Sequence, residues 1–184
     1  MSPPTAAGRA TSLPAPSGRP DPEQMRRVMG QFVTGVCAVS TRFDGPSGTG
    51  HDAIAVNSFT SVSLDPPLVS MCLRADSAFL RRIRTEGAWA VSFLGDGARG
   101  LVRDLTMPSE QRPPVERAAS WDIGPHTGCL LLAEGPGTLE CAMHQTQPLG
   151  DHVLVVGRVL GAVWRDEAPL AFHRGAFTSV GRPA

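Results

Sequence analysis

The chain has 184 residues, and its 17 basic residues are balanced by 17 acidic ones. All the basic residues are arginines and tyrosine is absent. The sequence thus excludes mechanisms that need a Schiff-base lysine, a P-loop lysine, or a tyrosine as general acid or base. A net charge of zero excludes electrostatic steering to nucleic acid or to an anionic membrane. Any bound anion must therefore be held by arginine, backbone N–H groups or hydroxyls.

The remaining totals predict one soluble, β-rich domain. Hydrophobic residues make up 41% of the chain, and 20 glycines and 17 prolines separate short apolar runs. No run approaches the roughly 18 apolar residues of a membrane span, and no secretory segment is visible. The four cysteines lie in apolar runs, which is typical of buried thiols in a reducing compartment. We therefore expect a cytoplasmic protein.

The N-terminal region predicts a tail followed by a helix. Residues 1–20 are rich in Pro, Ala, Gly, Ser and Thr, and predict a disordered tail ahead of one domain over residues 21–184. Asp21 is a good N-cap and Pro22 suits the first helical position, so a short helix is expected from Pro22 to about Phe32.

Most of the rest predicts antiparallel strands. Strands are expected at Val33–Thr41, Ala53–Phe59, Thr60–Leu64, Leu68–Leu73, Trp89–Leu94, Leu130–Ala133, Gly137–His144 and Val153–Trp164. Short helices are expected at Ala78–Arg84, between Ser77 and Gly87, and at Ala98–Leu105. Three prolines make residues 106–120 a long loop, and the turn over 147–151 predicts a hairpin. The absence of βαβ alternation indicates a closed or sandwiched antiparallel sheet.

Two sequence motifs resemble ligand-binding sites but have simpler structural explanations. Gly95–Gly100 matches the dinucleotide fingerprint, but the second strand of that unit would fall among the prolines of 106–120. We interpret it as a polar turn that starts a helix. His126 with Cys129, and Cys141 with His144, resemble zinc-ligand pairs. The second pair has strand character, which points its two side chains to opposite faces, so no metal site is expected.

Three stretches carry most of the functional information. Asn57–Val69 holds five small polar side chains before a proline stop. It is either a half-exposed strand or a groove of hydroxyls and amides around a planar polar ligand. Gly150-Asp151-His152 places a histidine beside an acid at the mouth of a hairpin. Either Gly-Asp simply forms the turn and His152 is solvated, or His152 binds a carboxamide or a phosphate. Arg174 in Phe172–Gly175 is either a surface charge or an anion clamp.

These stretches, in this order, resemble the flavin reductase family, which supplies reduced flavin to two-component monooxygenases. The resemblance runs from about Met25 to Gly181 and rests on six segments. They are Met29–Val36, Asn57–Val69, Cys72–Ser77, Trp89–Leu94, Gly150–His152 with Val156–Val159, and Pro169–Gly175.

The resemblance implies a mainly β split barrel of Greek-key type with a few short peripheral helices, as a homodimer with flavin near the interface. It implies that His51, Asp52, Ala53, Ile54, Ala55, Asn57 and Ser58 line the isoalloxazine, largely through backbone groups. Cys72, Leu73, Arg74, Ser77, Ala78 and Phe79 approach the ribityl chain and phosphate, the last three at a helix N-terminus that favours anions. His152 and Arg174, with the flanking His173 and Gly175, face the nicotinamide nucleotide.

The sequence departs from the family pattern in three places, and the first two leave the choice between FAD and FMN open. Asp104-Leu105 stands near the place of the usual Arg-Phe pair, and Pro113–Arg117 replaces an Asp-Arg/Lys-Phe stretch. Phe172-His173 replaces an aromatic pair.

The hypothesis is an NADH-dependent flavin reductase, with NADPH as the alternative donor. It transfers hydride to FAD or FMN and releases reduced flavin to a separate monooxygenase, with His152 orienting the nicotinamide or supplying a proton. The alternatives are a non-catalytic flavin- or haem-binding split-barrel protein, which would not need His152 and Arg174, and a Rossmann-type dehydrogenase.

Overall fold

The structure is a computed structural model that describes residues 18, 21–45, 48–108 and 111–181. The predicted disordered tail, residues 1–20, lies outside the described residues except for Gly18. Within the described part, strands form one large sheet and two small ones.

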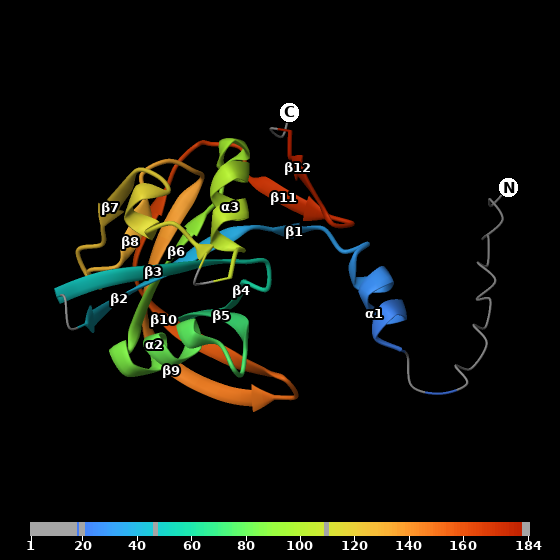
Figure 1. Ribbon diagram of the computed structural model, residues 1–184, viewed down its shortest axis with the longest axis horizontal. Helices are drawn as coiled ribbons and strands as arrows, with labels where there is room; N and C mark the ends of the chain where they lie inside the picture. The colour runs from blue at the N-terminus through green and yellow to red at the C-terminus, as the bar shows by residue number, and fades with distance from the viewer. Residues whose placement is uncertain (1–17, 19–20, 46–47, 109–110, 182–184) are drawn as a thin grey trace, which may run out of the picture.

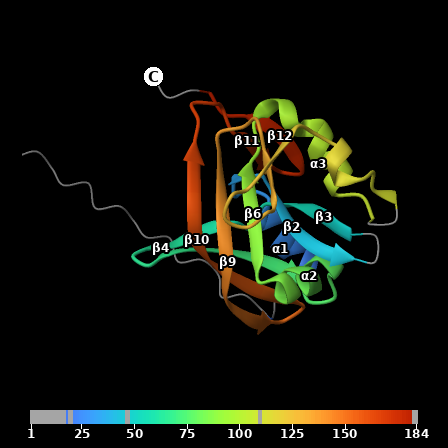
Figure 2. The same ribbon diagram turned by 90° about the vertical axis from the view of Figure 1, so that its left-hand side faces the viewer.

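The large sheet contains seven antiparallel strands in the order β3-β2-β6-β9-β10-β5-β4. Its strands are β2 (Cys37–Gly45), β3 (Gly48–Val56), β4 (Thr60–Leu64), β5 (Pro67–Arg74), β6 (Ala88–Phe93), β9 (Gly137–Leu149) and β10 (His152–Trp164). Its edge strands β3 and β4 are consecutive in the chain and are joined by residues 57–59. Figures 1 and 2 show the sheet strongly curved around its core. The predicted mainly β split barrel is confirmed, and so is the β9–β10 hairpin.

The small sheets lie beside this barrel. One has the order β1-β11-β12, with β1 at Thr34–Gly35, β11 at Leu170–His173 and β12 at Ala176–Ser179. The other pairs β7 (Trp121–Ile123) with β8 (Leu130–Leu132). The prediction of one strand over Val33–Thr41 was wrong, because Val36 separates β1 from β2 and the two strands pair in different sheets.

Three short helices complete the fold. In α2 (Ala78–Glu86), the Ser77 hydroxyl accepts a hydrogen bond from Leu80 N, and Gly87 ends the helix at φ 69°. α2 and α3 (Arg99–Leu105) bury apolar side chains against the barrel. α1 (Pro22–Met29) is capped by Asp21 and begins at Pro22 as predicted, but it ends at Met29, earlier than the expected Phe32. It buries none of its residues and stands away from the barrel in Figure 1. No helix in the described part of the chain is long and apolar enough to cross a membrane.

The barrel core depends on a close approach between Trp89 and Gly157. Trp89 is fully buried on β6, and Gly157 lies on β10. A Cβ atom at Gly157 would collide with the indole ring and lie 3.1 Å from the Cβ of Cys141. The glycine thus lets β10 approach the tryptophan, which places the long β9–β10 hairpin and the His152 at its mouth.

Candidate functional site

A groove of about 1230 Å³ separates α1 from the barrel. Its lining comes from α1, β1, the β3–β4 connection and the β11–β12 turn. The lining residues are Glu23, Arg26, Arg27, Met29–Gly35, Asn57–Thr60, Phe172, Arg174 and Gly175. The groove therefore joins two of the three stretches that the sequence predicts to be functional.

The barrel side of the groove presents amide and hydroxyl groups at Asn57 and Ser58. Ser58 Oγ lies 3.1 Å from both the amide nitrogen and the carbonyl oxygen of Cys72 on β5. It accepts from the amide and donates to the carbonyl, so it fixes the β3–β4 connection on the neighbouring strand.

Thr34 adds a hydroxyl to the same groove. Its Oγ1 is buried and has no hydrogen-bond partner among the described residues. A buried hydroxyl without a partner is costly, so this atom is suited to meet a polar ligand group. Together with the volume of the groove, the arginines and Asn57, this donor set fits a flavin or a nicotinamide nucleotide.

Arg174 reaches the groove from a strained turn. The two-residue loop between β11 and β12 has φ 52° at Arg174 and φ 81° at Gly175, which is the signature of a type I′ turn. Such positions favour glycine or asparagine, and another residue there costs about 1 kcal/mol. Arg174 N donates to Gly30 O at 3.1 Å, which ties the turn to the end of α1.

His152 marks a second polar cluster, at the paired ends of β5 and β10. Arg74 is opposite His152 in the strand register. His152 Nδ1 lies 2.8 Å from Asp151 Oδ1, and this hydrogen bond lowers the pKa of the Asp151 carboxyl. With Nδ1 engaged, the other ring nitrogen is the one left for a ligand.

Arg74 is already paired in this cluster. Its guanidinium donates twice to Asp76, at 3.0 and 2.9 Å, and the pair raises the pKa of Arg74 and lowers that of Asp76. A phosphate that bound Arg74 would have to compete with this carboxylate. The expected contact of Arg74 with flavin phosphate stays a prediction.

Several residues expected to line the flavin have their side chains engaged elsewhere. His51 Nε2 lies 3.1 Å from Gly128 O, and Ala53 is fully buried. Asp52 forms ion pairs with Arg82 of α2 and with Arg112 of the long loop. Ile54 packs against the core cluster that contains Trp89, and Ala55 packs against the one that contains Leu94 and Leu170. Contact between this segment and flavin, expected largely through backbone groups, stays a prediction.

The remaining predicted residues divide between core and surface. Leu73 and Phe79 are buried in the barrel core. Cys72 is partly buried, Ser77 caps α2, and Ala78 follows it in an exposed position. His173 is half-buried on β11, next to Arg174.

The groove also contains residues that sequence reasoning missed, namely Arg26 and Arg27 on α1, Phe32, and Thr34 on β1. The signal for the α1 face was present. Met25, Val28, Met29 and Phe32 repeat at helical spacing, yet all four are more than half exposed. This periodicity predicts an apolar helix face, but it does not show what covers that face.

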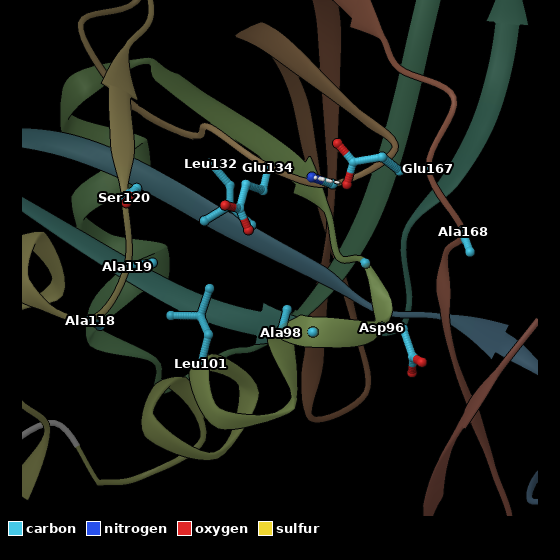
Figure 3. A pocket seen from close by; sticks show the side chains of 13 residues that line it. Asp96, Ala98, Leu101, Ala118, Ala119, Ser120, Leu132, Glu134, Glu167 and Ala168 are labelled. Carbon is cyan, nitrogen blue, oxygen red and sulfur yellow. Dashed lines mark hydrogen bonds between the residues drawn. The ribbon is translucent and has the colours of Figure 1, made fainter.

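A second cavity, of about 490 Å³, lies between η1 (Asp96–Ala98), α3, the approach to β7 and the loop before β11. Figure 3 shows the Glu134 side chain near Leu132, and Glu167 accepting a hydrogen bond from Gly135 N at 2.8 Å. The Asp96 side chain points away from these residues in the same view. None of the predicted site residues lines this cavity.

The two motifs set aside on sequence grounds occupy ordinary structural positions. Gly95–Gly100 spans η1 and the start of α3, and the residues described after it form no βαβ unit. Cys141–His144 lies within β9 as predicted. No group of three or more His, Cys, Asp or Glu side chains suited to a metal ion occurs in the described part of the chain.

Comparison with known proteins places the chain in one family. The model of the "Flavin reductase like domain" matches residues 29–181. An NADH-dependent FAD reductase from Streptomyces globisporus is 36% identical over 161 residues, which cover 85% of each chain. A reductase subunit of a flavin-dependent monooxygenase from Rhodococcus jostii is 31% identical, over 87% of this chain and 78% of the relative.

The fold comparison agrees. The NADH:FAD oxidoreductase of Streptomyces globisporus, solved in complex with NAD and FAD fragments, superposes with a TM-score of 0.80 at 31% identity. The match covers 91% of this chain and 99% of that one.

Proposed function

Because this chain belongs to the family of flavin reductase like domains, we propose that it is an NAD(P)H-dependent flavin reductase. Its two substrates are a nicotinamide nucleotide and FAD or FMN, and a hydride passes from nicotinamide C4 to flavin N5. That transfer requires stacking at close distance in a dry site, and no protein nucleophile. A chain without lysine or tyrosine can therefore carry it out.

The observation that carries this proposal is the composition of the groove. One wall offers Asn57 and Ser58, and the opposite side offers Arg174 and the arginines of α1. Amides and hydroxyls suit the polar edge of an isoalloxazine, and arginine suits phosphate. The site thus has the groups that two phosphorylated ring systems need.

His152 is proposed to act on the nucleotide side. Asp151 holds Nδ1, so Nε2 is free to bind the carboxamide or to deliver a proton after hydride transfer. Asp151 and Arg74 border His152, and both are exposed to an incoming ligand.

We also propose that the domain over residues 21–184 works as a homodimer. α1 and the segment after it expose Met25, Val28, Met29, Phe32 and Val33, with Phe32 67% exposed. An apolar surface of this kind beside a ligand groove is suited to a second copy, which would also exclude water from the groove.

The proposed partner is a separate flavin-dependent monooxygenase, as the relative from Rhodococcus jostii suggests. A cytoplasmic location is proposed because the four cysteines, all within the described residues, are free thiols. NADH is the proposed donor, since the Streptomyces relative is named for it. The assay below compares FAD with FMN as the flavin substrate.

The test is steady-state oxidation of NADH by the full-length protein with FAD, FMN or riboflavin, followed at the nicotinamide absorbance band. We expect turnover that depends on both flavin and enzyme. Binding of flavin without turnover would favour a non-catalytic flavin-binding protein and would overturn the proposal.

A further inference from the structure

The Gly95–Gly100 segment is not part of the groove, yet it contacts the strand that follows the Arg174 turn. Arg99, the first residue of α3, donates from Nη1 to Phe177 O on β12 at 2.9 Å. Its Nη2 lies 3.0 Å from Asp96 Oδ1 and 3.5 Å from Ser179 Oγ. One guanidinium therefore connects η1 and α3 to the outer strand of the β11–β12 hairpin.

The inner strand of this hairpin, β11, pairs with β1 and buries Leu170 and Ala171 in the core. At the base of the hairpin, Leu170 N donates to Leu94 O at 2.7 Å, and at its tip Arg174 N donates to Gly30 O. β12 is an edge strand that pairs only with β11. Within the described residues, Arg99 donates side-chain hydrogen bonds to two residues of β12, Phe177 and Ser179.

Packing beneath the hairpin leaves a small cavity. A cavity of about 200 Å³ lies between the hairpin, α3 and the barrel, and is lined by Val102, Thr106, Phe172 and Phe177 among others. Phe172 and Phe177 contact each other across the hairpin at 5.4 Å between ring centroids. Both rings also pack as partly buried side chains against the core cluster that contains Val102 and Leu170, so packing and the hydrogen bonds of Arg99 together hold the hairpin.

The conformation of Arg174 makes that position important. A non-glycine residue at φ 52° persists only where the surrounding structure holds it. Arg174 is three residues from Phe177, whose carbonyl Arg99 binds. A shift of β12 would therefore move the guanidinium of Arg174 relative to the groove.

We propose that Arg99, oriented by Asp96, is a positioning residue that holds the β11–β12 hairpin so that Arg174 can bind the phosphates of the nicotinamide nucleotide. This inference rests on the proposed function. The Ser179 hydroxyl and Arg99 both lower the pKa of the Asp96 carboxyl, which keeps it charged beside the guanidinium.

The test is a double-mutant cycle between Arg99 and Arg174, with steady-state kinetics and flavin binding as readouts. Arg99→Gln is expected to raise the KM for NADH roughly fivefold, the equivalent of one lost hydrogen bond. The kcat and the Kd for flavin are expected to stay unchanged. In an Arg174→Ala background, Arg99→Gln is expected to add nothing, because the group it positions is gone.

Two further variants sharpen the result. Arg103→Gln is the matched control, because Arg103 lies on the same helix, is exposed, and is outside the groove; its KM should equal that of the wild type. Arg99→Lys keeps the charge but loses the planar fork, so its KM should fall between those of the wild type and Arg99→Gln. It also serves as the test if Arg99→Gln fails to fold.

Each contrary outcome is distinguishable. An unchanged KM in the Arg99 variants, an equal loss of flavin affinity, or a full effect of Arg99→Gln in the Arg174→Ala background overturns this inference alone. Absence of NADH oxidation by the wild type would instead overturn the proposed function, and with it this inference.

Discussion

The hydroxyl of Ser58 joins the β3–β4 connection to β5 at the groove, with Oγ 3.1 Å from both the amide nitrogen and the carbonyl oxygen of Cys72. The bond joins the connection between the barrel's edge strands to β5, which also pairs with the strand that carries His152. Ser58 thereby links the amide-rich wall of the groove to the histidine cluster.

Ser58→Ala is expected to weaken flavin binding roughly fivefold and to lower the free energy of unfolding by about 1 kcal/mol, because it leaves two backbone groups of Cys72 without this partner. Fluorescence titration with FAD and chemical denaturation measure the two effects. Ser61→Ala is the control, since Ser61 is exposed on β4. Equal behaviour of the two variants would show that the Ser58 bridge does not organise the groove.

Arg174 is expected to lower the stability of the fold while it strengthens the binding of NADH. Arg174→Asn places a residue that tolerates the left-handed region at φ 52°, so the free energy of unfolding should rise by about 1 kcal/mol. The same change removes the guanidinium and should raise the KM for NADH roughly tenfold, as for loss of a charge-assisted hydrogen bond. Gly175→Ala is the comparison, because its φ of 81° should make it destabilising. A less stable Arg174→Asn variant would contradict the strain argument.

Gly157→Ala tests the contact that shapes the barrel. The added Cβ would collide with the fully buried Trp89 ring, and overpacking of this kind costs about 1–3 kcal/mol. Thermal and chemical denaturation would measure the loss. Gly100→Ala should have the opposite sign, since Gly100 lies within α3 and a Cβ there meets no atom within 4 Å. Equal stability of Gly157→Ala and the wild type would mean that β10 has room to shift.

The cysteines give a pH-dependent prediction. Burial raises the pKa of the Cys37 and Cys141 thiols to about 12 and also raises that of Cys129, whereas thiols in the unfolded chain ionise near pH 8.5. The unfolded state therefore loses these protons first, and stability should fall as pH rises from about 9 towards about 12. Denaturation midpoints across this range test the sign.

The same burial predicts selective labelling. At about pH 8, a thiol reagent should modify Cys72 rapidly in the folded protein, because Cys72 is only partly buried and the other three cysteines are buried. FAD should slow the reaction, because Ser58 connects Cys72 to the groove. Rapid labelling of Cys72→Ser would contradict the burial of the other three thiols.

Local sequence signals predicted the elements whose boundaries are set by neighbouring residues. Ser77 and Gly87 bracket α2 as expected, and the β9–β10 hairpin follows its turn. The split between β1 and β2 was missed, because β1 pairs with Phe172 and Ala171 far along the chain. The β11–β12 hairpin was missed because arginine at its first turn position hides the usual asparagine-glycine signal.

The sequence indicated two of the stretches that line the groove, but it did not indicate ion pairs between distant side chains. Asn57, Ser58, Arg174 and Gly175 lie in the groove. Arg82 and Arg112 engage the carboxylate of Asp52, while the expected contact of its backbone with flavin stays a prediction. Pairings of this kind join residues 30 and 60 positions apart, and neither periodicity nor spacing indicates them.

Anaerobic mixing of NADH and FAD with the protein, followed at the flavin absorbance, tests the central claim most directly. The wild type should bleach FAD rapidly, and His152→Ala should do so more slowly while it binds FAD with unchanged affinity. Flavin reduction at equal rates in the two proteins would contradict the role of His152, and no reduction by the wild type would contradict the assignment as a flavin reductase.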